Sequence, residues 1–356
     1  MMGNHNFLTA GVLVAILVML AGCDDKPILL AEQHREADAL IARINTSVTR
    51  LRSVPITSEH APWVIMHGIY AFGDGWTIQD APSTKPVTAL QWASAAGADR
   101  LFMIWQNGVR QISASSRSPH FRLADHPDQW LFIFSERSIP LSLPIAIGNS
   151  SATVQDLLGG AKLSVNRHAE LIWSVTALAN YRVAGTWKNT YGEDLSLDDL
   201  ARSLLNMDWR NTPCGGTHYL YAAARLAECP SIARATRQQL RAFLAVSVDR
   251  AKRSQSPQGT WTPNWVHDTP DKEELGGHVI IQTTGHQLEW LALAVNDQEL
   301  LAGWMTEAVR RLTDVIDGFT GDPSSLANEA KVHPEVYGVL CHASHGLELY
   351  RARISE

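Results

Sequence analysis

The sequence predicts an all-α protein, arranged as an α/α toroid in which an outer ring of helices encloses an inner ring. Apolar residues recur at helical spacing through most of the chain. Segments that are apolar on one side alternate with segments that are apolar nearly all round, in about five to six pairs. No fixed repeat length is evident, which favours a closed barrel over the alternative, an open solenoid of helical pairs.

The predicted outer helices each have one polar side. Their apolar residues lie at helical spacing among charged ones, over residues 37–51, 240–251 and 301–315. Two further outer helices begin with a Thr or Ser that is followed three residues later by Asp, the spacing of a capping box, and they cover residues 153–163 and 196–207. These segments account for the outer ring.

The predicted inner helices follow the outer ones along the chain. They are apolar or small on nearly every side, as expected for helices covered all round, and they cover residues 62–72, 168–181, 216–227, 285–295 and 336–350. Residues 126–139 add part of another pair. Two long stretches, 73–125 and 255–277, interrupt the pattern and are too long for simple connections. We expect either lids across one mouth of the barrel or surface insertions.

The N-terminus predicts export from the cytosol. Residues 7–20 form a short apolar run that ends in Leu20-Ala21-Gly22-Cys23. This ending resembles the lipobox of bacterial lipoproteins, in which a peptidase cuts before a cysteine whose thiol carries a diacylglycerol. The resemblance implies a signal peptide over residues 1–22 and lipidation of Cys23. An uncleaved membrane anchor is the alternative.

Either N-terminal interpretation places the body of the protein outside the cytosol, on the cell envelope. Residues 23–28 would form the lipidated tether and residues 29–356 a single toroid domain. Asp24 resembles the acidic signal that keeps some lipoproteins in the inner membrane. The first six residues depart from the usual signal peptide because they contain neither Lys nor Arg.

Composition limits the partners. The net charge is −6, which argues against nucleic acid, and 45% of the residues are hydrophobic, enough for a sizeable core. Cys214, Cys229 and Cys341 follow the lipidated cysteine, and three thiols cannot all pair within one chain.

One motif supports the predicted fold. Gln255, Gly259 and Trp261 have the spacing Gln, any three, Gly, any one, Trp. This resembles the QW motif of the terpenoid cyclase and protein prenyltransferase superfamily, whose members are α/α toroids and use the motif to tie helices together. The resemblance covers roughly residues 150–350. It does not imply those activities, because the acidic motif of the cyclases and the zinc pattern of the prenyltransferases are absent.

Histidines recur in the predicted inner helices, at His67, His168, His218, His286, and His342 with His345. Parallel inner helices would bring residues near their N-terminal ends to one mouth of the barrel. We therefore expect a shared catalytic or ligand-binding cavity lined by imidazoles. The alternative for each histidine is a core position with a hydrogen bond to the backbone.

Metal binding is a further hypothesis. Cys214 lies four residues before His218, and His342 three residues before His345, so each pair can share one side of a helix. Four such ligands suit zinc, although Cys214 and Cys229 could instead form a disulfide. Cys214 and Cys341 with their neighbours faintly resemble the zinc ligands of lanthionine synthetases, but the full motifs are absent.

Acidic and aromatic residues complete the predicted site. Glu289 interrupts an apolar helix, and a buried carboxylate requires a polar partner or a functional role. The alternative to a functional role is a structural ion pair with an Arg. Aromatic walls with carboxylates also build sugar sites. The other residues of this kind are Trp63, Asp125, Asp128, Tyr219 and Trp290.

These observations support two hypotheses of function. The first is an envelope enzyme that uses its histidine-lined cavity for acid/base or metal-assisted chemistry on an isoprenoid, a glycan or a peptide. The second is a non-catalytic, lipid-tethered binding or scaffold protein that uses the cavity or loops of the toroid to hold a ligand. A filled barrel centre would favour this second hypothesis.

Overall fold

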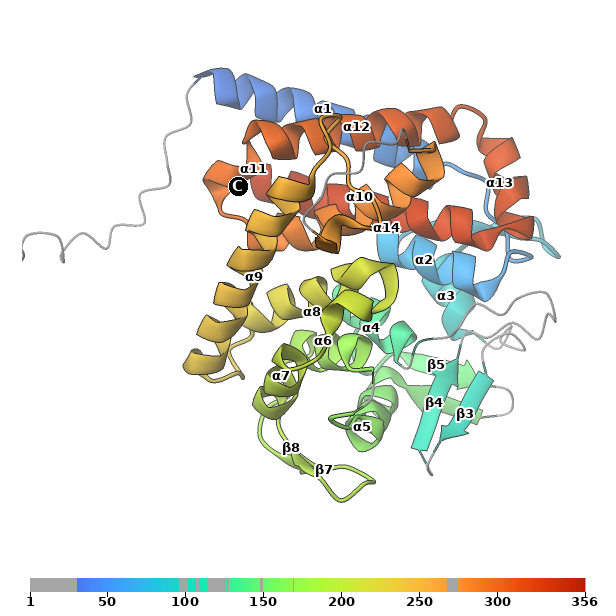
Figure 1. Cartoon of the computed structure of the whole chain (residues 1–356). Helices are drawn as coiled ribbons and strands as arrows, with labels where there is room; N and C mark the ends of the chain where they lie inside the picture. Colours follow the sequence, from blue (N-terminus) through green and yellow to red (C-terminus); the bar gives the residue numbers. More distant parts are fainter. Residues whose placement is uncertain are drawn as a thin grey trace, which may run out of the picture.

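The protein is mostly helical, as predicted. A computed structural model describes residues 31–95, 102–106, 109–113, 126, 128–147, 150–168, 170–267 and 275–355. This part of the chain contains fourteen α-helices and four short antiparallel strand pairs (Figure 1). The predicted signal peptide, Cys23, the predicted tether and Asp125 lie outside these residues.

Six of the helices have few exposed residues and correspond to the predicted inner set. They are α2 (Pro62–Phe72), α4 (Gln129–Glu136), α6 (Ile172–Asn180), α8 (Thr217–Glu228), α10 (Gly277–Ala294) and α14 (Pro334–Ile354). α10 begins eight residues before the predicted segment, and its first turns carry more polar residues.

Five helices with one exposed side correspond to the predicted outer set. They are α1 (Ala31–Arg52), α5 (Val154–Ser164), α7 (Leu197–Leu205), α9 (Arg234–Ser254) and α12 (Gly303–Phe319). Both predicted capping boxes are confirmed, because Thr153 and Ser196 each exchange hydrogen bonds with the Asp three residues ahead. Three shorter helices were not predicted, namely α3 (Ala89–Ser94), α11 (Asp297–Leu300) and α13 (Pro323–Val332).

The buried helices contact one another in a regular succession. α2 contacts α4, α4 contacts α6, α6 contacts α8, α8 contacts α10, and α10 packs along α14. α14 in turn contacts α2, so the last buried helix lies against the first. On the outside, α1 and α12 lie side by side although they are far apart in sequence (Figure 1).

Strands occur both in and beyond the first long insertion. β1 (Thr77–Asp80) pairs with β2 (Lys85–Thr88), and β3 (Phe102–Gln106) pairs with β4 (Val109–Ser113), all within residues 73–125. Two further pairs lie outside it, namely β5 (Pro144–Ile147) with β6 (Ser150–Thr153) and β7 (Trp187–Lys188) with β8 (Asp194–Leu195). These two hairpins, which the sequence reasoning missed, precede the outer helices α5 and α7.

The QW-like motif ties the start of the second insertion to helices α9 and α12. The side-chain amide of Gln255, at the end of α9, donates to the carbonyls of Gly259 and Trp304, and Trp304 lies in α12. The fully buried Trp261 donates its indole N–H to the carbonyl of Ala251 in α9. With Trp265 also buried, in the 3₁₀ turn Trp265–His267, this stretch belongs to the core and is no mere surface insertion.

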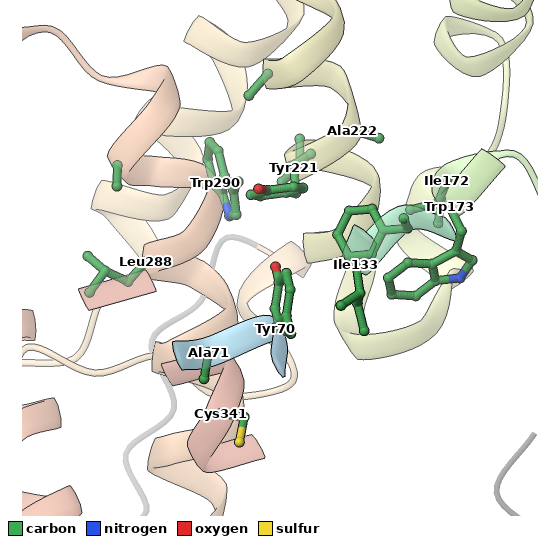
Figure 2. Close-up of a cluster of buried hydrophobic side chains, with 14 of the residues drawn as sticks. Tyr70, Ala71, Ile133, Ile172, Trp173, Tyr221, Ala222, Leu288, Trp290 and Cys341 are labelled. Atoms are coloured by element: carbon green, nitrogen blue, oxygen red, sulfur yellow. The ribbon is translucent and has the colours of Figure 1, made fainter. Parts of the chain in front are cut away.

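The core is rich in aromatic residues. Figure 2 shows Tyr70 of α2, Trp173 of α6, Tyr221 of α8 and Trp290 of α10 among the buried side chains of the core. Such side chains bury large apolar areas and carry a polar group that needs a partner. Among the described residues, no helix is both long and apolar enough to cross a bilayer.

Candidate functional site

Four buried helices bring five histidines together in the interior. His67 comes from α2, His218 from α8, His286 from α10, and His342 and His345 from α14. The ring centroids of His218, His286 and His342 lie 4.2 to 5.1 Å apart, and that of His67 lies 5.2 Å from His342. The expected gathering of histidines far apart in sequence is therefore present. We call these five residues the histidine cluster.

Glycines allow the close approach of α10 and α14, the two longest of the buried helices. A Cβ atom on Gly285 of α10 would lie 2.7 Å from the Cβ of Ala343 in α14. A Cβ on Gly346 would lie 3.0 Å from the backbone nitrogen of Glu289. The absence of side chains at these two positions lets α10 and α14 lie together and places Glu289 beside the histidines of α14.

A left-handed turn places His218 in the first turn of α8. Cys214, Gly215 and Gly216 all have positive φ values, of 55°, 62° and 79°. A Cβ on Gly216 would lie 2.5 Å from the ring of Trp209, so this position accepts only glycine without a shift of its neighbours. Cys214 adopts a backbone conformation that costs energy for a residue with a side chain, which is common near functional sites.

Glu289 is the hub of the site's hydrogen bonds. Its Oε1 accepts from the hydroxyl of Tyr70 at 2.8 Å, from Nδ1 of His342 at 3.0 Å and from Nδ1 of His345 at 3.0 Å. Its Oε2 lies 3.1 Å from Nδ1 of His342. The side chain of Glu289 is 2% exposed, so these donors replace the water that a buried carboxylate lacks. Its partners are thus imidazoles and a phenol, and no Arg of the described residues forms the ion pair that was the predicted alternative.

Backbone carbonyls fix the protonated nitrogen of two other histidines. Nδ1 of His67 lies 2.7 Å from the carbonyl oxygen of Trp63, and Nδ1 of His286 lies 2.5 Å from that of Gln282. A carbonyl oxygen can only accept, so each Nδ1 carries the proton. In a neutral imidazole the other nitrogen, Nε2, then presents a lone pair.

Burial keeps the imidazoles neutral. Loss of solvation lowers the pKa of His342 to about 3 and, together with the neighbouring His342, lowers that of His286 to about 4. Burial lowers the pKa of His345 to about 4 even though its hydrogen bond to Glu289 acts in the opposite direction. The pKa values of His67 and His218 are held well below the ordinary range, mainly by burial and secondly by the neighbouring histidines. At neutral pH the cluster therefore offers lone pairs.

Four groups of the site lie within reach of a single ion. His218, His286, Glu289 and His342 can each offer one ligand atom, and these atoms all lie within 4.8 Å of one another. Imidazole nitrogens and a carboxylate suit zinc and related divalent transition metals. The donor chemistry therefore fits a metal, with a ligand set different from the predicted one: His218 and His342 belong to it, whereas Cys214 and His345 do not.

Other predicted residues lie outside the cluster. His168 precedes α6 and is exposed, because that helix begins only at Ile172. Tyr219 is buried but faces Trp209 and Phe243. Trp63 supports the site indirectly, since its ring lies 3.7 Å from that of His67.

Cys214 borders a small pocket beside the cluster. The pocket has a volume of about 230 Å³, and Trp265, Thr217, Gln282 and Thr283 are among its lining residues. Thr217 directly precedes His218, and the carbonyl of Gln282 holds His286, so the pocket shares its wall with the site. Cys214, Cys229 and Cys341 are all free thiols, and the alternative disulfide between the first two is not formed.

Sequence reasoning missed several polar residues around the site. Tyr70 lies three residues after His67, one helical turn on, which is the signal that could have found it. His126 and Glu170 pair at 2.9 Å, and the His126 ring lies 5.1 Å from that of Trp173, which in turn contacts His218 at 4.8 Å. Nothing in their spacing along the chain joins these two residues.

Comparison of this chain with models of protein families, with curated proteins and with solved structures found no match.

Proposed function

We propose that this protein is a metal-dependent enzyme of the cell envelope, with a divalent transition metal, zinc foremost, bound at the centre of its histidine cluster. The observation that carries the proposal is the convergence of ligand atoms from His218, His286, Glu289 and His342 within 4.8 Å of one another. Neutral imidazoles gathered in a buried cluster supply acceptors but few protons, and a single cation would satisfy their lone pairs together.

The same proposal includes a closed α/α toroid as the scaffold. The succession of contacts from α2 through α4, α6, α8 and α10 to α14, and from α14 back to α2, supports a ring of inner helices. The hydrogen bonds of Gln255 and Trp261 support it further, because they tie helices together as the QW motif of the resembling superfamily does. In a ring of this kind the cluster would occupy the centre.

Placement on the cell envelope rests on the N-terminal sequence. The ending Leu20-Ala21-Gly22-Cys23 supports lipidation of Cys23, and the tether would then hold the domain close to a membrane, with Asp24 favouring the inner one. Substrates of such an enzyme would be isoprenoids, glycans or peptides. Metal ions contribute to such chemistry by polarising a bond or activating water.

A specific observation favours a second candidate, a binding or scaffold protein with a purely structural metal. The site residues are almost fully buried, with His218 8% exposed and His286 3% exposed. Structural zinc sites are closed by four protein ligands, whereas catalytic sites keep one position open. In this case the metal would stabilise the fold without any reaction.

Metal analysis tests the proposal. The full-length protein, purified in detergent, is incubated with zinc, passed through a desalting column and measured for zinc per chain by mass spectrometry. We expect one zinc ion per chain in the wild type and in His168→Ala, the matched control, because His168 is exposed and outside the cluster. We expect its loss in His286→Ala. A wild-type protein that retains no metal after separate incubations with zinc, cobalt and manganese would show the proposal to be wrong.

A further inference from the structure

The hydrogen bonds of Glu289 bear on how a metal would be coordinated. Oε1 of Glu289 accepts from Tyr70, His342 and His345, so this oxygen is fully used. The other carboxylate oxygen, Oε2, also lies within hydrogen-bond distance of Nδ1 of His342, at 3.1 Å. An ionised carboxylate only accepts, so both histidines must be protonated at Nδ1, and in the neutral imidazole of His342 the lone pair then belongs to Nε2.

This arrangement is typical of a carboxylate that positions a metal ligand. Metal-binding histidines almost always donate the N–H of the non-ligating nitrogen to a carboxylate or a backbone carbonyl. His342 makes the first kind of contact, to Glu289, and His286 the second, to the carbonyl of Gln282. Both rings therefore already have the partner that a ligating imidazole requires, and their Nε2 atoms are left for the ion.

We propose that the ion is held by the imidazoles of His218, His286 and His342 alone, that Glu289 positions His342 without touching the ion, and that one coordination position stays open for water or another small oxygen or nitrogen donor. The inference rests on the proposed metal site and deepens it. Three histidines and an exchangeable fourth ligand are characteristic of catalytic zinc, whereas four protein ligands are characteristic of structural zinc.

His67 supports an open position. It lies beside His342, with ring centroids 5.2 Å apart, and its Nδ1 is bound to the carbonyl of Trp63, so Nε2 carries a lone pair. His67 does not belong to the group of residues whose ligand atoms lie within 4.8 Å of one another. An imidazole that is close to the ion's ligands but is not one of them suits a hydrogen bond from bound water.

The site is nearly closed to solvent. His218 and His342 are 8% and 6% exposed, respectively, and His286 is 3% exposed. The 230 Å³ pocket beside it is bordered by Thr217, which is next to His218, and by Gln282, which holds His286. A small anion or hydroxamate is therefore a suitable probe for the open position.

Cobalt spectroscopy tests the inference. The full-length protein in detergent is loaded with Co²⁺, whose visible absorption reports the number and kind of ligands, and is then titrated with azide and with acetohydroxamate. We expect each titrant to change the visible spectrum of the wild type. Glu289→Gln, which keeps the shape of the side chain and an oxygen acceptor, should bind Co²⁺ roughly 10- to 100-fold more weakly and still respond to azide. His286→Ala should lose Co²⁺ far more completely, and His168→Gln should match the wild type.

Three results would overturn the inference. If Glu289→Gln loses Co²⁺ as completely as His286→Ala, the carboxylate is a ligand. If azide and acetohydroxamate leave the wild-type spectrum unchanged, the site is closed. If the wild type binds neither Co²⁺ nor Zn²⁺, the proposed metal-dependent function fails as well, and that failure is distinguishable because it appears before any variant is made. Circular dichroism of each variant without metal separates loss of a ligand from loss of the fold.

Discussion

At the scale of single residues, the environment of Asp128 is unfavourable to its charge. This residue precedes α4, is 9% exposed, and accepts a hydrogen bond of 2.5 Å from the hydroxyl of Ser174. Burial raises the pKa of its carboxyl from 3.8 to about 6, and the hydrogen bond from Ser174 opposes this rise only in part. The folded protein therefore binds the proton of Asp128 more tightly than the unfolded chain does.

This pKa shift predicts a dependence of stability on pH. Because the pKa is higher in the folded state, protonated Asp128 contributes fully to the free energy of unfolding below about pH 4. This contribution is lost as the pH rises through about 6, which lowers the free energy of unfolding by roughly 3 kcal/mol. Asp128→Asn has no such titration, and asparagine tolerates the left-handed backbone at this position, where φ is 61°. We expect the variant to gain stability relative to the wild type between pH 4 and pH 8.

Thermal melts of both proteins across this pH range check the prediction. The difference between the two melting temperatures isolates Asp128, because the other titrating groups are shared. A difference that is constant from pH 4 to pH 8 would contradict the assigned shift.

The residues of the site differ in how far their sequence revealed them. Glu289 is predictable because a carboxylate in an otherwise apolar helix needs partners, and the structure supplies Tyr70, His342 and His345. The pairing of Glu289 with Tyr70 is not predictable, since 219 positions separate them and the contact depends on how two helices meet. The sequence also favoured Tyr219, whereas Tyr221 is the one whose ring lies 6.0 Å from His345.

At the scale of elements, the packing of α10 on α14 controls the geometry of the site. Gly285, the residue directly before His286, lies against Ala343 of α14. A Cβ at Gly285 would come within 2.8 Å of the Ala343 Cα. A methyl group here must push the helices apart. The same movement would separate Glu289 from His342 and His345, because these pairs span the two helices.

Gly285→Ala should therefore destabilise the protein and loosen the site. Overpacking costs about 1–3 kcal/mol, while the better helix propensity of alanine returns at most about 1 kcal/mol. Gly159→Ala is the matched control, because Gly159 lies inside α5 and a Cβ there would meet no atom within 4 Å. Urea unfolding should show a loss of stability for the first variant and a small gain for the second. Equal stability of the two variants would contradict the packing argument.

The elements themselves were predictable where local signals are strong. Residues 62–72 form the helix that uniform apolarity predicts, and Thr153 and Ser196 start helices where their capping boxes predict. α13 was missed because its ten residues include Ser, Asn and Lys with few apolar neighbours. The hairpins β5/β6 and β7/β8 were missed because strands of two to four residues leave little periodicity to detect.

The expected reason for the histidine cluster was only partly correct. His218 does lie in the first turn of its helix, but His286 and His342 lie well inside α10 and α14. His168, the residue that best fitted a helix N-terminus, is exposed before α6. The cluster depends on the positions along α10 and α14 at which these long helices cross their neighbours. The spacing of residues within one helix does not reveal where along its length such a crossing occurs.

At the scale of the whole molecule, the buried site and the predicted N-terminal signal depend on different parts of the chain. The first described helix, α1, begins at Ala31, after the proposed tether, and we therefore expect the fold of the helical body to be independent of any modification at Cys23. The predicted export and anchoring would depend instead on the short apolar run and on the cysteine that follows it. The two parts can therefore be tested independently.

Replacing Cys23 with Ser should abolish lipidation and leave the folded domain intact. Transfer of the diacylglycerol requires the thiol, and a serine hydroxyl is a much weaker nucleophile near neutral pH. We expect wild-type cells fed a radioactive fatty acid to yield a labelled, processed protein, and the Cys23→Ser strain to yield an unlabelled precursor that still carries residues 1–22. Cys229→Ser is the control, because that thiol is buried in the domain, 3.9 Å from the carbonyl of Ala179, and should leave labelling unchanged. Label in the Cys23→Ser protein, or cleavage of that protein between Gly22 and position 23 without any label, would show that the chain is not a lipoprotein. Loss of label with an unchanged circular dichroism spectrum would show instead that the anchor is attached at Cys23 and that the helical body folds without it.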